Sequence, residues 1–148
     1  MLAIGVDIGG TKVAAGVVDE DGGVLAMLRR PTPSDDVAET EAAIATVVAE
    51  LTDRHDVVAV GIGAAGWIAS DRATVLFSPH LAWRNEPLRD ALAGRIGLPV
   101  TVENDANAAA WAEYRYGSAR GERVVVCVTL GTGIGGGVVV SGVLYRGA

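Results

Sequence analysis

The chain has 148 residues, half of them hydrophobic and 20% charged, a composition typical of a folded globular domain and not of a disordered chain. Its net charge of −6 argues against a nucleic-acid surface, because such a surface needs a basic stripe. The single cysteine, Cys127, allows no disulfide within the chain and predicts a reducing, cytoplasmic location, and no apolar stretch reaches the roughly 18 residues that a membrane span requires.

The first part of the chain predicts a strand meander, then a helix, then a buried strand. Apolar runs at residues 2–6, 13–18 and 24–28 predict three antiparallel strands joined by glycine turns. Ser34 is expected to cap the amphipathic helix that follows. The continuous apolar run at residues 57–62 is typical of a parallel strand that is covered on both faces.

The rest of the chain continues to alternate between helices and strands. Asn85 is expected to cap a second helix, which Gly97 and Pro99 end. An alanine-rich helix is expected to run to Tyr116. The strands predicted in this part lie at residues 100–102, 124–130 and 138–140. The order of elements predicts an α/β fold with a mixed sheet flanked by helices.

The two ends of the chain repeat one pattern. Residues 2–18 read as strand, glycine turn and strand, and residues 124–140 read the same way. This predicts a duplicated fold whose second copy has barely begun. We expect a small N-terminal lobe at residues 1–117, which binds sugar and phosphate, and the first strands of an incomplete large lobe at residues 118–148.

The first glycine turn, at residues 7–12, carries side chains suited to phosphate chemistry. Asp7 ends a buried strand, where an unpaired carboxylate would be costly, so a Mg²⁺ ion or its bound water is expected beside it. Thr11 and Lys12 offer a hydroxyl group and a cation to phosphate oxygens. The alternative is structural: Asp7 caps the turn, and Lys12 is a solvated strand residue.

The second glycine turn, at residues 131–137, contains the pattern GxGxxG at Gly131, Gly133 and Gly136. A dinucleotide-binding fingerprint needs a helix directly after the glycines, whereas the β-type run at residues 138–140 follows here. Glycine allows backbone N–H groups to approach phosphate oxygens closely, so the two turns are expected to form two walls of one nucleotide cleft. The alternative is that these glycines serve only a hairpin.

A third motif, Glu-Asn-Asp-Ala-Asn at residues 103–107, lies at a strand-to-helix junction. Asp105 is expected where the helix begins, and the helix dipole there favours its ionised form. Phosphoryl transfer through a loose transition state asks little of its base beyond orientation. Asp105 is therefore the candidate that aligns a substrate hydroxyl and takes its proton. The alternative is that Asp105 only caps the helix.

These three motifs, in this order, resemble the N-terminal half of the bacterial glucokinases of the ROK family, a group of repressors, open reading frames and sugar kinases. The resemblance covers essentially the whole chain. It implies an actin-like, ribonuclease-H-like fold with two lobes that close on ATP and a hexose, the second lobe being truncated here. It also implies transfer of the ATP γ-phosphate to the 6-hydroxyl of glucose or a related hexose, with little or no activity from this fragment alone.

The resemblance implies roles for individual residues. Asp105 would be the catalytic base, and Asp7 would hold Mg²⁺ directly or through water. The sugar would contact Asn104 and Asp105 together with Gly66 and His80; the family commonly has Asn where this chain has His80, which leaves the hexose open. The residues implied near the ATP phosphates are Gly9, Gly10, Thr11, Lys12, Gly131, Thr132 and Gly133. ATP and Mg²⁺ are the expected cofactors, and no zinc is expected in a chain with one cysteine.

Two other classes of function stay open from the sequence. Sugar-responsive transcriptional regulators of the same family carry a DNA-binding helix-turn-helix ahead of this domain, and a first strand that begins near residue 2 disfavours that class. A non-catalytic sugar-binding remnant would have no turnover. Within the kinase class, other hexoses, a polyphosphate donor and a homodimer also stay open. Neither a nucleic-acid partner nor a membrane partner is expected.

Overall fold

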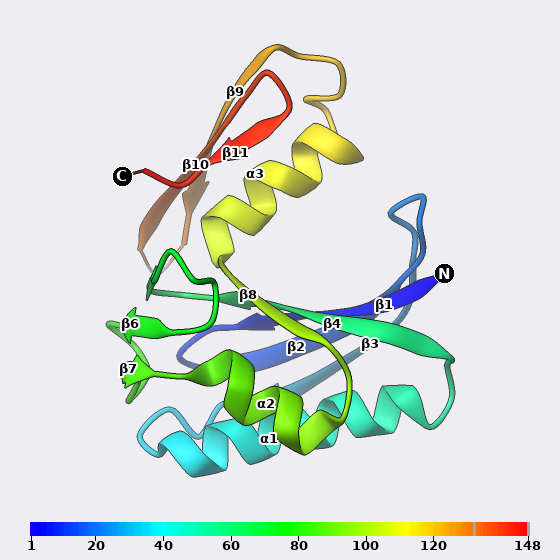
Figure 1. Ribbon diagram of the computed structural model, residues 1–148, viewed down its shortest axis with the longest axis vertical. Coiled ribbons are helices and arrows are strands. Elements are labelled where there is room, and N and C mark those ends of the chain that lie inside the picture. Colours follow the sequence, from blue (N-terminus) through cyan, green and yellow to red (C-terminus); the bar gives the residue numbers. More distant parts are fainter. Residues whose placement is uncertain (132, 148) are drawn as a thin grey trace.

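The computed structural model describes residues 1–131 and 133–147 and shows an α/β fold built around a mixed sheet (Figure 1). This main sheet has five strands in the order β3-β2-β1-β4-β8. The pairs β1–β2 and β2–β3 are antiparallel, whereas β1–β4 and β4–β8 are parallel. The strands are β1 (Leu2–Ile8), β2 (Lys12–Val18), β3 (Val24–Pro31), β4 (Val57–Ala64) and β8 (Val100–Asn104). The predicted fold class is confirmed.

Helices α1 (Val37–Thr52) and α2 (Leu88–Ile96) cover one face of the main sheet, below it in Figure 1. Ile44, Val48 and Leu51 of α1 are buried at the helical spacing i, i+4, i+7. They join one core with the alternate residues of the strands that point toward the helices.

No helix in residues 1–131 and 133–147 is long and apolar enough to cross a membrane.

Both predicted N-caps, Ser34 and Asn85, are wrong. The N-cap of α1 is Asp36 and not Ser34: its carboxylate accepts a hydrogen bond from the backbone N of Glu39 at 2.8 Å. A turn that begins at Pro33 carries the chain past Ser34 before the helix starts. Asn85 lies in a short strand with φ of 51°, and α2 begins at Leu88, with Pro87 at the N-cap position and no side-chain cap hydrogen bond.

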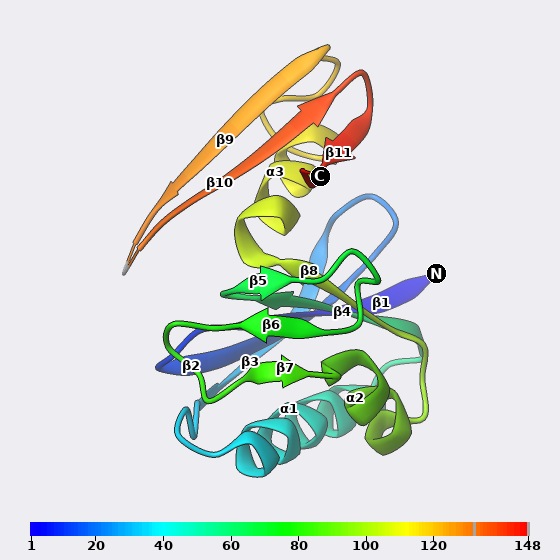
Figure 2. The ribbon, with the colours of Figure 1, turned by 60° about the vertical axis from the view of Figure 1, so that its left-hand side comes forward.

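A second, small sheet was not predicted from the sequence. Its strands, β5 (Trp67–Ile68), β6 (Val75–Phe77) and β7 (Arg84–Glu86), lie in the order β5-β6-β7 beside the main sheet (Figure 2). Strands of two or three residues are too short to show an alternating pattern. Val75 and Trp83 anchor this sheet, because both are fully buried in the main core.

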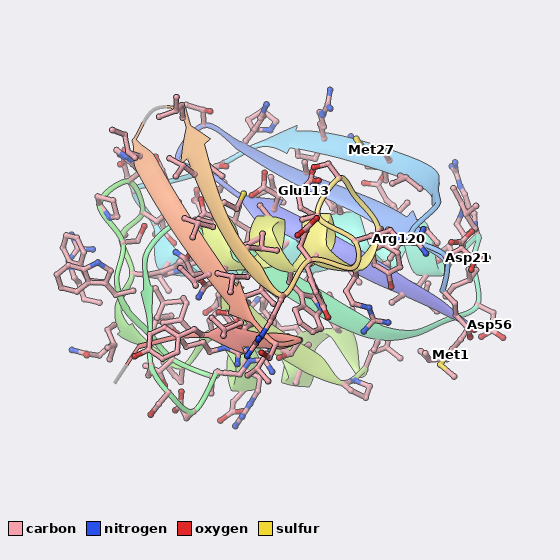
Figure 3. The ribbon with its side chains drawn as sticks, turned by 90° about the horizontal axis from the view of Figure 1, so that it is seen from above. Met1, Asp21, Met27, Asp56, Glu113 and Arg120 are labelled. Carbon is pink, nitrogen blue, oxygen red and sulfur yellow. The ribbon has the colours of Figure 1, made fainter. Side chains whose placement is uncertain are left out.

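The third sheet, in the order β11-β10-β9, lies across α3 (Asp105–Arg115) when the molecule is viewed from above (Figure 3). Its strands are β9 (Val124–Leu130), β10 (Ile134–Val140) and β11 (Val143–Tyr145). It has a small core separate from the main one, made of Ala110, Val125, Val139 and Leu144. The predicted lobe boundary after residue 117 stays a prediction, and α3 links the third sheet to the main one.

The outer face of the third sheet, on the side opposite α3, is apolar and exposed. Val126, Leu130 and Ile134 expose 67%, 79% and 82% of their surface. Side chains on a strand alternate between its two faces, so the inward residues of β9 pack on α3 while these residues face away from it.

The glycines at residues 135–137 lie within β10 and not in the turn, which corrects the predicted end of that turn. A Cβ atom at Gly137 would lie 2.6 Å from Cβ of Ala110 and 2.8 Å from the carbonyl oxygen of Ala106. At Gly135 it would lie 2.8 Å from Cβ of Ala106. The glycines therefore let α3 pack almost directly against the backbone of β10.

Replacing Gly137 with Ala tests this packing. The added methyl group meets helix backbone that cannot rotate away, so Gly137→Ala is expected to lower the free energy of unfolding by about 1–3 kcal/mol, as overpacking does. Gly136→Ala is the matched control, because the nearest atom to its Cβ would be the carbonyl oxygen of Cys127 at 3.7 Å. Urea denaturation measures both. Equal stability of the two variants would contradict the packing argument.

Candidate active site

A cleft of about 1160 Å³ lies between the main sheet and α3, on the sheet face opposite α1 and α2. Its floor is formed by the outward positions of the sheet strands, several of which are glycines, including Gly5 and Gly61. Because these positions lack side chains, the face stays open. The charged residues that line the cleft are Asp7, Lys12, Arg29, Arg72, Glu103, Asp105 and Arg146. Four cations against three carboxylates make the cleft suited to an anionic ligand, although the whole chain is acidic.

Asp7 reaches this cleft from the end of β1. It pairs in register with Gly63 of β4, and Gly63 pairs with Glu103 of β8, so these three positions form one row across the parallel strands. Burial raises the pKa of the Asp7 carboxyl, the nearby charge of Asp105 raises it further, and Lys12 lowers it. The structure therefore brings Asp7, Lys12 and Asp105 to one cleft.

Asp105 is the first residue of α3, half-buried at the cleft wall. Its Oδ1 accepts a hydrogen bond from the backbone N of Ala106 at 2.9 Å, and Oδ2 accepts none from the described residues. A Cβ atom at Gly63 would lie 3.8 Å from the Cα of Asp105, in ordinary van der Waals contact, so the start of α3 packs close to the strand row. Asp105 thus keeps one carboxylate oxygen available to a ligand in the cleft.

Asn104, and not Asp105, is the N-cap of α3, so the capping alternative for Asp105 is wrong. Its Oδ1 accepts from the backbone N of Asn107 at 3.0 Å, and its Nδ2 donates to the carbonyl oxygen of Gly66 at 3.0 Å. A Cβ atom at Gly66 would collide with the carbonyl oxygen of Phe77. Asn104 and Gly66 are thus joined to each other. Neither lines the cleft, and the sugar contacts predicted for them stay predictions.

The first glycine turn lies at the end of β1 and is held by its own hydrogen bonds. The backbone N of Gly9 donates to the carbonyl oxygen of Lys12 at 3.0 Å, and the hydroxyl of Thr32 donates to the carbonyl oxygen of Gly9 at 2.8 Å. His80 packs against this turn, since a Cβ atom at Gly10 would lie 2.7 Å from the Cβ of His80. Thr11 and His80 are exposed, and Gly9, Gly10, Thr11 and His80 lie outside the cleft lining.

The second turn ends β9, where the backbone N of Gly131 donates to the carbonyl oxygen of Gly133 at 2.9 Å. Both glycines are exposed and outside the cleft lining, whereas Thr129 of β9 lines it. Thr132 lies outside the described residues. β1 and β9 both run toward the left-hand side of Figure 1, so the two turns lie at the same side of the molecule. Their contact with phosphates stays a prediction.

Sequence reasoning missed four charged cleft residues, Arg29, Arg72, Glu103 and Arg146. Glu103 is buried at the end of β8 and accepts a hydrogen bond from Nε of Arg146 at 2.7 Å. Arg72 Nε lies 3.6 Å from the same carboxylate. A carboxylate beside Val102 near the end of a predicted strand was the available signal, but its partners are distant in sequence and could not be identified from spacing.

The donor set in the cleft can accommodate a divalent cation through a small number of protein ligands. No group of three or more His, Cys, Asp or Glu side chains gathers around a common point within the described ranges. Asp7 and Asp105 supply two neighbouring carboxylates, and their mutual repulsion would be relieved by a cation. Mg²⁺ typically takes one or two protein carboxylates and completes its shell with water and phosphate, so these residues fit it.

Replacing Asp7 with Asn is expected to stabilise the fold at neutral pH. The raised pKa means that the folded state binds this proton more tightly than the unfolded state. The carboxyl group therefore favours folding below its unfolded pKa, and that stability is lost as pH rises through its folded pKa. Asn does not titrate, so the advantage of Asp7→Asn over wild type should be larger at about pH 7 than at about pH 4.

Urea denaturation at both pH values, in metal-free buffer, measures this difference. Asp21→Asn is the control, because Asp21 lies in an exposed turn outside the cleft. If the Asp7→Asn variant were less stable than wild type at neutral pH, the carboxylate would not be the unfavourable charge described above.

Comparison with known proteins identifies the family. The model of the ROK family matches residues 3–148. The glucokinase of Streptomyces coelicolor is 55% identical over 146 residues, which are 99% of this chain and 46% of that protein. A crystal structure of a ROK family glucokinase from Streptomyces griseus in complex with glucose and AMPPNP superposes with a TM-score of 0.96 at 55% identity, covering 100% of this chain and 47% of that one.

A crystal structure of an inorganic polyphosphate/ATP-glucomannokinase from Arthrobacter sp. strain KM has a TM-score of 0.90 at 38% identity, covering 99% of this chain and 61% of that one. These superpositions confirm the actin-like fold that the motifs implied. The chain spans about half the length of the curated relatives that it matches. On the family match over nearly its whole length, the chain belongs to the ROK family.

Proposed function

We propose that this chain forms the half of an ATP-dependent hexose kinase that carries the catalytic base. The observation that carries the proposal is the pair Asp7 and Asp105, which face one cleft beside Lys12. The 55% identity to a glucokinase, and to a structure described with glucose and AMPPNP, supports glucose as the acceptor and ATP as the donor. The single cysteine, Cys127, supports a reducing, cytoplasmic location.

Asp105 acts as the general base in this proposal. Its free Oδ2 accepts the proton of the hexose 6-hydroxyl, the hydroxyl oxygen forms a bond to the γ-phosphorus of ATP, and the bond from that phosphorus to the β–γ bridging oxygen breaks, so that ADP leaves. The hydrogen bond from Ala106 fixes the carboxylate plane, which supplies the orientation that this reaction requires.

Asp7 is the residue proposed to hold Mg²⁺, directly or through water, with Asp105 close by. A Mg²⁺ ion held there would neutralise part of the phosphate charge. Lys12 adds a second cation at the same cleft. The backbone N–H groups of the two glycine turns are proposed to bind phosphate oxygens, at Gly9, Gly10, Thr11, Gly131, Thr132 and Gly133.

The sugar is proposed to bind at the junction where β8 meets α3. Asn104 and Gly66 are already joined there by a hydrogen bond, which supports one shared sugar subsite. His80 packs on Gly10 of the first turn, so a change at His80 would alter the turn as well as the sugar pocket. We propose the lobes at residues 1–117 and 118–148, with the cleft between the main sheet and the third sheet as the catalytic site.

Asp105→Asn tests the proposed function in the chain extended to the full length of its relatives. Loss of a general base should reduce kcat about 10²–10⁴-fold, whereas glucose affinity should change little, because Asn keeps the shape and one acceptor oxygen. Coupled-assay kinetics and calorimetric glucose titration measure the two quantities. Glu113→Gln is the matched control, an exposed residue on the same helix whose carboxylate accepts hydrogen bonds from Ser118.

Retained turnover in Asp105→Asn would contradict the role of Asp105 as the general base. If the wild-type protein binds sugar but shows no turnover, the protein is a sugar-binding protein and not a kinase. Glucose, mannose, fructose and N-acetylmannosamine, each with ATP or polyphosphate and Mg²⁺, form the substrate panel. The 148-residue chain alone is expected to be weakly active or inactive. Turnover by it equal to that of the extended chain would contradict the need for a second half.

A further inference from the structure

The carboxylate of Glu103 connects three parts of the molecule. It is buried, with 11% of its side chain exposed. Its Oε1 accepts hydrogen bonds from the backbone N of Asn104 and from Nδ2 of Asn107, both at 3.1 Å. Its Oε2 accepts from Nε of Arg146 at 2.7 Å and lies 3.6 Å from Nε of Arg72. One side chain thus binds the start of α3, the segment after β11 and the turn between β5 and β6.

We propose that Glu103 is a positioning residue that fixes Asp105 in its catalytic orientation and that Arg146 sets the position of Glu103. This inference rests on the proposed function and deepens it, because it couples the catalytic base to the third sheet. Glu103 itself is not placed in contact with substrate. Its effect passes through the first turn of α3.

The Oε1 side of Glu103 controls the first turn of α3. Asn104 and Asn107 flank Asp105, and each is bonded both to Glu103 and to the other. A rotation of the Glu103 carboxylate would therefore move both residues that flank Asp105. Since a general base depends on alignment to within a fraction of an ångström, even a small displacement should reduce turnover.

The Oε2 side links this turn to the third sheet. Among the hydrogen bonds of residues 1–131 and 133–147, the one from Arg146 to Glu103 is the one that joins the segment after α3 to the main sheet. The rest of the third sheet contacts α3 through small apolar surfaces such as Gly137 against Ala110. Such surfaces carry no directional bond, so the ion pair defines where the third sheet sits relative to the catalytic junction.

Arg72 has a different role from Arg146. It adopts a left-handed backbone with φ of 54°, and its carbonyl oxygen accepts from the backbone N of Val102 at 3.3 Å. Its buried Nε has no hydrogen-bond partner, and it contributes charge to Glu103 at 3.6 Å. A buried carboxylate that lost its hydrogen-bonded partner would be strongly unfavourable, so the directional bond from Arg146 is the one that matters for orientation.

The test uses Glu103→Gln, Arg146→Gln and the double variant in the chain extended to the length of its relatives. Gln keeps an oxygen for Asn104 and Asn107, but its amide group cannot accept from Arg146. Each single variant is expected to lower kcat about tenfold or more with glucose affinity within about twofold, and the double variant should be no worse than the worse single one, as expected for two residues that act as a unit.

Arg120→Gln is the matched control, an exposed arginine in the segment after α3 that is labelled in Figure 3. Arg146→Lys should recover part of the lost turnover, because its ammonium group can still donate a hydrogen bond to Glu103. Unchanged kcat in Arg146→Gln, or effects that add in the double variant, would overturn the proposal. A fall in kcat that matches a fall in the fraction of folded protein would also overturn it. The Arg146 side chain is 41% exposed, so its variants are expected to fold. They can therefore be used for the test if Glu103→Gln does not fold.

Hydrogen–deuterium exchange separates this inference from the proposed function. If wild-type protein shows no kinase activity, the proposed function fails, but the amides of residues 105–108 still report on the first turn of α3. Arg146→Gln is expected to speed their exchange several-fold relative to Arg120→Gln, because that turn loses its support. Equal exchange in the two variants would overturn the positioning role of Glu103, whatever the activity.

Discussion

The parallel pairing of β1, β4 and β8 is the constraint on which the site depends. Parallel strands end at the same edge of a sheet, so the pairing puts Asp7, Gly63 and Glu103 in one row. The start of α3 packs close to Gly63 in the middle of that row, and Asp105 lines the same cleft. The carboxylates are thus placed by backbone register and not by contacts between their side chains.

Much of the fold could be predicted because the long strands and helices carry their own periodicity. The main sheet and all three helices were found where apolar residues recur at strand or helix spacing. The β5–β7 sheet was missed because its strands are too short for a pattern. The end of the second turn was misplaced because glycines at residues 135–137 read as a loop, whereas helix–sheet packing, a tertiary effect, selects them.

The candidate site was predictable in part, for a similar reason. Asp7 and Asp105 stand at strand ends, where a carboxylate is conspicuous in the sequence, and the structure brings them to one cleft. Glu103 stood within the same motif, but its partner Arg146 lies 43 residues further on. An ion pair over that separation depends on how the third sheet packs on the rest of the molecule. It therefore cannot be predicted from a local sequence pattern. Asp105 was also given a possible capping role that in fact belongs to Asn104.

The contact of Gly135 and Gly137 with Ala106 and Ala110 has a consequence for how these sequences can diverge. Glycine is already the smallest residue. A larger side chain on α3 therefore cannot be accommodated by a smaller residue on β10. A larger side chain at Ala106 or Ala110 should therefore be rejected whatever residue stands opposite it on the strand. The helix that carries Asp105 should therefore tolerate substitution on its solvent side more readily than on this one stripe.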